Sequence, residues 1–139
     1  MAIVQTATNA FKQGLMSGTY NLGSDAFKIA LYTGNANLGV DTAAYVTSNE
    51  VVASGYTAGG ELLNCSVQPV VVNNVAYVSF SNVTWNSALT ARAALIYRFN
   101  GSTNPSVCVL DFGADKTSTS TFTVQFPVAT DTSAIIRIV

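Results

Sequence analysis

The stretch from Ala93 to Phe99 restricts what this chain can fold into more than any other part of the sequence. Side chains alternate between the two faces of an extended strand, and both faces of this stretch are largely apolar. A strand that is apolar on both sides is covered on both sides, by a second sheet, a helix or a neighbouring subunit. We therefore expect a strand here at the centre of the fold.

A second apolar stretch, from Ser106 to Gly113, follows after a short polar link. The link contains Asn100-Gly101, a pair that tolerates positive φ, and Pro105, which cannot donate a hydrogen bond to a neighbouring strand. We expect the two stretches to form a hairpin. A polar loop is expected after it, from Gly113 to Ser120.

Shorter apolar and alternating stretches flank this hairpin on both sides. They predict strands at 25–33, 50–53, 62–72, 75–80, 83–85, 121–126 and 134–139, with turns at 73–74 and 55–60. Pro69 indicates a bend or an edge position, and the last strand is expected to be mostly buried. The pattern predicts an all-β fold, a jelly roll or β-sandwich of about eight strands, in one domain over residues 1–139.

One amphipathic helix is predicted over residues 3–18, within a leading segment 1–18 that precedes the β body at 25–139. Apolar residues recur at spacings of three and four and form a single stripe: Val4, Ala7, Phe11 and Leu15. Gly18 follows as a stop. We expect the helix to cover the end of its own sheets or another subunit.

Charged residues are unusually rare in this chain. Of its 139 residues, 49% are hydrophobic and 9% are charged, against a usual charged share of about 25%. The surface of such a chain is hydrated through uncharged polar residues such as Ser, Thr and Asn, or is buried against partners. The formal net charge of −1 provides no field to attract nucleic acid or anionic lipid.

No stretch approaches the roughly 20 apolar residues of a membrane span, and the N-terminus lacks the basic and apolar regions of a signal peptide. We therefore expect a cytoplasmic protein that binds neither membrane nor nucleic acid directly. Cys65 and Cys108 lie in apolar segments with no second Cys nearby, and we expect buried thiols, although the sequence leaves a disulfide open.

The chain has no histidine, so Ser-His-Asp, Cys-His and His-based metal sites are excluded. Two carboxylate hypotheses remain. Asp111 and Asp115 would bind calcium if they met at a loop, although a turn-forming Asp explains the pair as well. Glu50 and Glu61 would serve a glycosidase if they faced each other across a cleft. We expect no enzyme activity and no cofactor.

If the chain works by binding other proteins, its functional residues lie at the interfaces with those proteins. We expect the polar segment Gly34–Asn49, the leading helix and the last strand to supply them, because a loop this long is usually functional or held by a partner. The predicted interface residues are Phe11, Leu15, Leu38, Val40, Tyr45, Tyr56, Trp85 and Arg137. A lone Trp beside a strand is typical of a core or interface position.

An ordered set of phrases covers nearly the whole chain. It comprises Ser24–Thr33, Tyr45, Glu50-Val51, Gly55–Gly60, Thr84-Trp85, Ala91–Tyr97, Val109–Gly113, Asp115-Lys116 and Phe122–Pro127. Together they resemble the capsid cement, or decoration, proteins of short-tailed bacteriophages, a group of small structural proteins. The resemblance supplies no catalytic motif.

The resemblance implies a jelly-roll virion protein on the capsid surface, assembled in the host bacterial cytoplasm. Its implied partners are the major capsid protein and further copies of itself, as a dimer or trimer. A tail or fibre module that binds a host glycan through Trp85 and exposed tyrosines is the alternative.

Overall fold

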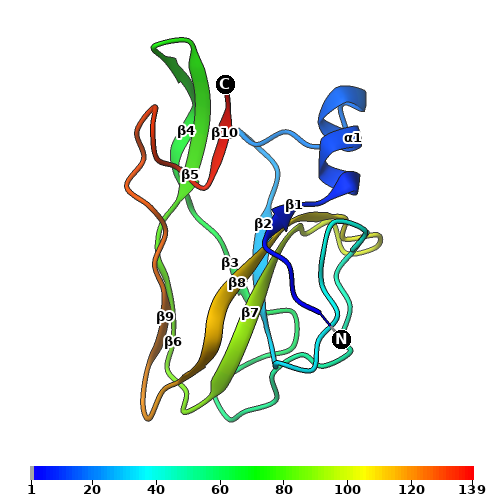
Figure 1. Ribbon diagram of the computed structural model, residues 1–139, viewed down its shortest axis with the longest axis vertical. Helices are drawn as coiled ribbons and strands as arrows, with labels where there is room; N and C mark the ends of the chain where they lie inside the picture. The colour runs from blue at the N-terminus through cyan, green and yellow to red at the C-terminus, as the bar shows by residue number, and fades with distance from the viewer. Residues whose placement is uncertain (1) are drawn as a thin grey trace.

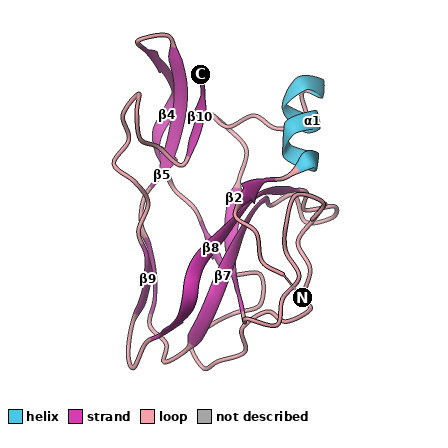
Figure 2. Ribbon diagram, viewed as in Figure 1, coloured by secondary structure: helices cyan, strands magenta, loops and turns pink. Residues whose placement is uncertain are grey.

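A computed structural model of the chain describes residues 2–139. It is mostly β, with antiparallel sheets and one short helix (Figures 1 and 2), and this confirms the predicted all-β sandwich with a single helix. In chain order the elements are β1 (Thr6–Ala7), α1 (Asn9–Ser17), β2 (Phe27–Tyr32), β3 (Glu61–Leu62), β4 (Cys65–Val72), β5 (Val75–Phe80), β6 (Val83–Trp85), β7 (Thr90–Arg98), β8 (Ser106–Thr117), β9 (Phe122–Val124) and β10 (Ile136–Ile138).

The predicted central strand is β7, which lies in the middle of a five-stranded sheet of order β1-β8-β7-β2-β3. Residues Ala93 to Tyr97 are at most 1% exposed. Ala94 and Ile96 pack into the larger core cluster, while Leu95 and Tyr97 pack into a smaller cluster on the opposite face. Both faces of the strand are therefore covered, as predicted, and the described chain itself covers them. We call β2, β7 and β8 the body.

The β7–β8 hairpin forms as predicted, but β8 continues through Thr117. The expected polar loop from Gly113 to Ser120 is therefore wrong for its first half. Gly113 adopts a φ of 82°, and the pairing with β7 shifts register between Ala91 and Ala93. A bulged strand can absorb such a residue without ending, because the extra residue is accommodated by a local twist.

The helix begins six residues later than predicted. Thr8 is its N-cap, with an extended backbone (φ −79°, ψ 157°), and its Oγ1 accepts a hydrogen bond of 3.2 Å from the Phe11 N–H. Thr6 and Ala7, which the predicted helix included, pair with β8 instead. The predicted stop at Gly18 is confirmed, since this residue is a left-handed C-cap with φ 78°.

A second sheet, of order β10-β5-β4, lies beyond the end of the five-stranded sheet, at the top of Figure 1. We call it the arm. Its hairpin turns at Asn73 and Asn74, with φ of 51° and 65°, and Pro69 lies in an edge strand, as predicted. The prediction of a mostly buried last strand is wrong, because Ile138 is 58% exposed.

The long segment 34–49 is held by the chain itself. Leu38 is buried, and backbone hydrogen bonds join it to Ala2 and Val4. Further along, the Tyr45 N–H donates to the Asn104 carbonyl. The short strand predicted at 50–53 is reduced to one bridge between Tyr32 and Glu50.

Candidate interaction surface and an internal carboxylate cluster

Half of the predicted interface residues belong to the core. Their exposed fractions are 4% for Phe11, 2% for Leu38, 8% for Tyr56 and 1% for Trp85. Side chains buried this deeply in their own chain have almost no surface to present to a partner. The apolar character that suggested an interface serves internal packing at these four positions.

Three predicted residues meet along one groove. Phe11 and Leu15 from α1 and Arg137 from β10 line a hollow of about 550 Å³, together with parts of β1, β8 and the segment before β10. Figure 1 shows α1 and β10 on the two sides of this part of the molecule. The leading helix and the last strand, which are far apart in sequence, therefore form one surface.

The groove has an apolar lining with cationic groups. Among the described residues that line it, Lys12 and Arg137 are the charged ones. The Arg137 Nε–H donates to the Asp131 carbonyl oxygen at 3.0 Å, which orients the guanidinium. A surface of this kind suits an apolar segment that carries a carboxylate.

Val40 lies in a different hollow, of about 500 Å³, formed by segment 37–46. Val40 is 38% exposed and Val46 is 44% exposed. The Ser106 Oγ–H donates to the Thr42 carbonyl at 2.5 Å, and the Asn9 amide donates to Asp41 Oδ1 at 3.0 Å, so the segment is tied to β8 and to the helix. This second surface is open but firmly anchored.

A buried carboxylate organises the middle of the chain. Glu50 is 7% exposed, and three donors surround it. The Tyr45 O–H donates to Oε1 at 2.6 Å, the Tyr56 O–H donates to Oε2 at 2.6 Å, and the Gly59 N–H donates to Oε2 at 2.8 Å. Burying a carboxylate is unfavourable unless it is hydrogen-bonded, and here both oxygens are engaged.

The tyrosines around Glu50 extend this cluster into the body. Tyr56 Oη also accepts a 2.9 Å hydrogen bond from the Leu31 N–H, and the Tyr97 O–H donates to the Gly59 carbonyl at 2.6 Å. The Tyr45 and Tyr97 rings stack with centroids 4.8 Å apart. Burial and the charge of Glu50 raise the pKa of Tyr97 to about 12, so it stays protonated at neutral pH. The cluster ties segment 45–59 to β2 and β7.

The glycine-rich turn at 55–60 is confirmed, and it explains how a backbone N–H comes within hydrogen-bond distance of Glu50. Gly59 and Gly60 have φ of 98° and 81°, and a Cβ on Gly60 would lie 1.7 Å from the Ile29 carbonyl oxygen. Only glycine allows the turn to approach β2 this closely. The approach places the Gly59 N–H against the carboxylate.

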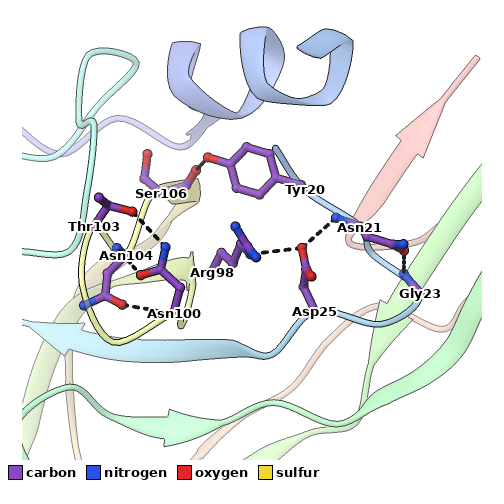
Figure 3. A network of polar contacts seen from close by, with 9 residues as sticks. All are labelled: Tyr20, Asn21, Gly23, Asp25, Arg98, Asn100, Thr103, Asn104 and Ser106. Atoms are coloured by element: carbon purple, nitrogen blue, oxygen red, sulfur yellow. Dashed lines mark hydrogen bonds and ion pairs between the residues drawn. The ribbon is translucent and has the colours of Figure 1, made fainter. Parts of the chain in front are cut away.

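A separate polar network joins the loop before β2 to the β7–β8 turn (Figure 3). The Arg98 guanidinium forms an ion pair with Asp25 at 3.0 Å, and Asp25 Oδ2 accepts a 2.7 Å hydrogen bond from the Asn21 N–H. The Tyr20 O–H donates to the Ser106 carbonyl at 2.6 Å. These contacts position the loop that leads from α1 into the sheet.

The acidic pair considered for calcium has a different arrangement. Asp111 Oδ1 lies 3.2 Å from the Arg92 Nε and accepts the Gly113 N–H at 2.9 Å. These interactions, led by the Gly113 hydrogen bond, lower the pKa of Asp111. Asp115 is exposed on β8. Within residues 2–139, no three His, Cys, Asp or Glu side chains are grouped to hold a metal ion. The turn-forming interpretation of Asp111 fits best.

Both cysteines are free thiols, as predicted, with Cys65 partly buried and Cys108 buried. Burial raises the pKa of Cys108 to about 12. In the described part of the chain, Trp85 Nε1 is the buried side-chain nitrogen that lacks a hydrogen-bond partner. This indole packs between Tyr56 and Phe122, which marks Trp85 as a core residue.

Sequence reasoning selected Glu50 only as one half of a catalytic pair and missed its role as an internal anchor. Nothing near it in sequence marks it as buried. The glycine turn that follows was a signal, because a backbone that needs positive φ is often one that packs closely against another element. Glu61, the other member of the supposed pair, is exposed at the start of β3.

Comparisons with known proteins identify no relative: no family model, no curated protein and no solved structure matches this chain. No helix within residues 2–139 is long and apolar enough to cross a membrane.

Proposed function

We propose that this chain is a non-enzymatic structural protein of a bacteriophage virion, a cement or decoration protein that binds the shell of major capsid protein and stabilises it. It acts as a homo-oligomer on the capsid surface and is assembled in the host cytoplasm. The observation that carries the proposal is the groove between α1 and β10. Its lining joins Leu15 and Arg137, two residues predicted to make contacts that are not buried in the core.

The low charge of the chain supports a role in protein contact. Neutral side chains can be buried at an interface without the desolvation penalty of unpaired ions. Lys12 and Arg137 add two cations at the groove, which complement a carboxylate on the shell. Many copies that span joints between capsid subunits add contact area that must be broken before the shell opens.

The glycan-binding alternative depended on Trp85 and on exposed tyrosines. Trp85 is 1% exposed, so its ring offers no platform for a sugar. Of the tyrosines, Tyr45 and Tyr77 are partly exposed and the others are buried. The carboxylate-enzyme alternative depended on Glu50, and both oxygens of that residue are engaged by donors of the chain itself. Neither alternative is favoured by a specific observation.

The test is binding to purified phage heads that lack this protein, followed by co-sedimentation and by cryo-electron microscopy of the particles. We expect saturable binding at regular positions on the shell and heads that withstand higher temperature. Protein that stays in the supernatant, or that locates to the tail, would contradict the proposal. Deleting the helix is uninformative because Phe11 is part of the core.

Point variants are therefore used to test the groove. Leu15→Asp and Arg137→Glu change side chains at its lining, and we expect each to weaken shell binding at least tenfold, which corresponds to about 1.4 kcal/mol. Val52→Asp is the control, because Val52 is 97% exposed and lies outside the groove. Equal shell binding by all three variants would show that the groove does not contact the shell.

A further inference from the structure

The arm carries an exposed apolar row that crosses all three of its strands. Val71 on β4, Ala76 on β5 and Ile138 on β10 are register partners, so their side chains lie side by side on one face. Val71 is 67% exposed and Ile138 is 58% exposed. The same sheet face continues from this exposed row into the core, where Val78 is 2% exposed.

The same face is hollowed between the row and the core. A small apolar cavity of about 90 Å³ is lined by residues that include Leu22, Pro69, Val78 and Ile136. The apolar surface of the face is therefore continuous from the core to the open end of the arm. Its inner part is covered by the chain and its outer part is not.

The strands β4 and β5 contribute no charged side chain to this face, although Ile138 at its β10 end also lines the groove that contains Lys12 and Arg137. No charged residue occurs between Glu61 and Arg92, a stretch that contains β4 and β5. The arm's charged residue is Arg137, which is paired with Tyr77 and so points to the opposite face. At the tip of the arm, the Asn73 amide donates to Asp131 Oδ2 at 2.8 Å.

We propose that the row Val71–Ala76–Ile138 packs against the same row of a second copy of this chain, across a two-fold axis. A two-fold axis places a patch against itself, so any charge near the axis would meet its own like charge. A neutral apolar patch avoids this repulsion and gives a charged partner nothing to attract. A second copy is thus the occupant that the charge pattern favours.

The contact is between sheet faces rather than sheet edges. Pro69 lies in the edge strand β4, where it cannot donate a hydrogen bond to an added strand. The register between Val67 and Val70 is also irregular, which disturbs the edge further. A continuous sheet formed through the β4 edge is therefore disfavoured, and the other edge, β10, is only three residues long.

The area of the face sets the strength of the dimer. Three strands about 4.8 Å apart and about 20 Å long would span roughly 300 Å² per copy. This is an upper bound, because β10 has only three residues and the inner part of the face is already buried at Val78. Two copies together therefore bury at most about 600 Å², less than the roughly 1,200 Å² of a stable specific complex. We therefore expect a dimer that dissociates at low concentration and forms when copies are concentrated, as they would be on a shell.

Sedimentation velocity of the full chain between about 5 and 500 µM tests this inference, since a weak dimer dissociates within that range. We expect the dimer fraction to rise with concentration, and Val71→Asp and Ile138→Asp each to weaken dimerisation at least tenfold. Val52→Asp, at a residue 97% exposed elsewhere on the surface, should dimerise like the unchanged chain. Emission from the buried Trp85 verifies that each variant is folded.

A chain that stays monomeric throughout, a trimer, or equal dimerisation of all three variants would overturn the inference. The inference rests on the oligomeric part of the proposed function and does not require shell binding. Because Ile138 also lines the groove and Val71 does not, Val71→Asp is the variant that separates dimerisation from shell binding. A chain that dimerises through this row but does not bind phage heads would contradict shell binding and leave the dimer standing. A permanent monomer that binds heads would contradict the dimer and the oligomeric part of the proposed function, and leave shell binding standing.

Discussion

The body and the arm are built from equally apolar strands, yet they are buried very differently. In β7 of the body, Leu95 and Ile96 are fully buried between two core clusters. In β4 of the arm, the three consecutive valines Val70, Val71 and Val72 are 39%, 67% and 39% exposed. Apolar character alone therefore does not decide burial. The body has its apolar surface covered by its own chain, whereas the arm leaves part of its apolar surface exposed.

The largest effect is expected when one apolar side chain in each region is truncated to alanine. Leu95→Ala removes a fully buried side chain from the body and should lower the free energy of unfolding by about 3 kcal/mol. Val71→Ala in the arm should change it by less than about 0.5 kcal/mol, because the side chain is exposed. Urea unfolding followed by Trp85 fluorescence, at low protein concentration, measures both. Similar losses would remove the distinction between the regions.

The second effect concerns the anchor that ties the middle segment to the body. Glu50→Ala leaves the hydroxyl groups of Tyr45 and Tyr56 and the Gly59 N–H without their acceptor. We expect a loss of about 2–3 kcal/mol in the free energy of unfolding. Glu61→Gln is the control, at an exposed residue, and should lie within about 0.5 kcal/mol of the unchanged chain. Equal stability of the two variants would contradict the role of Glu50.

The third effect is a loss of stability at alkaline pH that originates in the body. Burial raises the pKa of Cys108 from 9.0 to about 12, and burial with the charge of Glu50 raises that of Tyr97 from 10.0 to about 12. The unfolded chain releases these protons first, so their stabilising contribution is complete below pH 9 and is lost as pH rises toward 12.

The measurement is the urea midpoint as a function of pH. We expect the midpoint to fall as pH rises above 9. Burial also raises the pKa of Cys65 from 9.0, so the onset should move up toward 10, the ordinary pKa of tyrosine, in a variant that combines Cys65→Ser with Cys108→Ala. A midpoint that is constant to pH 12 would contradict the burial of these groups.

The smallest effect uses one cysteine in each region as a reporter. Cys65 lies partly buried in the arm strand β4, and Cys108 is buried in the body strand β8. With a thiol reagent, we expect Cys65 to react at least tenfold faster, through local opening of the arm. Single-thiol variants, Cys65→Ser and Cys108→Ala, separate the two signals. Equal rates would show that arm and body open together.

The sequence predicted those features whose cause lies in adjacent residues. The β7–β8 hairpin follows from two-sided apolar character and from the Asn100-Gly101 link. The tight turn at Asn73-Asn74 follows because asparagine tolerates the positive φ that both residues adopt. Pro69 marked an edge strand for the same kind of reason, since proline lacks an N–H.

The features that were mispredicted depend on contacts between distant segments. Thr8 begins the helix while Thr6 and Ala7 pair with β8, a choice that the apolar spacing does not reveal. Trp85 and Tyr56 were predicted at an interface because apolar aromatic residues suit a core and a contact surface equally. The burial of Glu50 could not be predicted without knowing that the glycine turn folds back and places the Gly59 N–H against its carboxylate. Burial of the last strand depended on a neighbour that only the fold reveals.

Amide hydrogen exchange at two protein concentrations tests most directly the central claim that the body is stable in a single chain, whereas the proposed second copy stabilises the arm. We predict that β7 amides exchange only through global unfolding at both concentrations. Amides of β4 and β5 should exchange faster at low concentration and gain protection at high concentration. Arm amides that are protected equally at both concentrations, or as strongly as those of β7 in the dilute chain, would contradict the account.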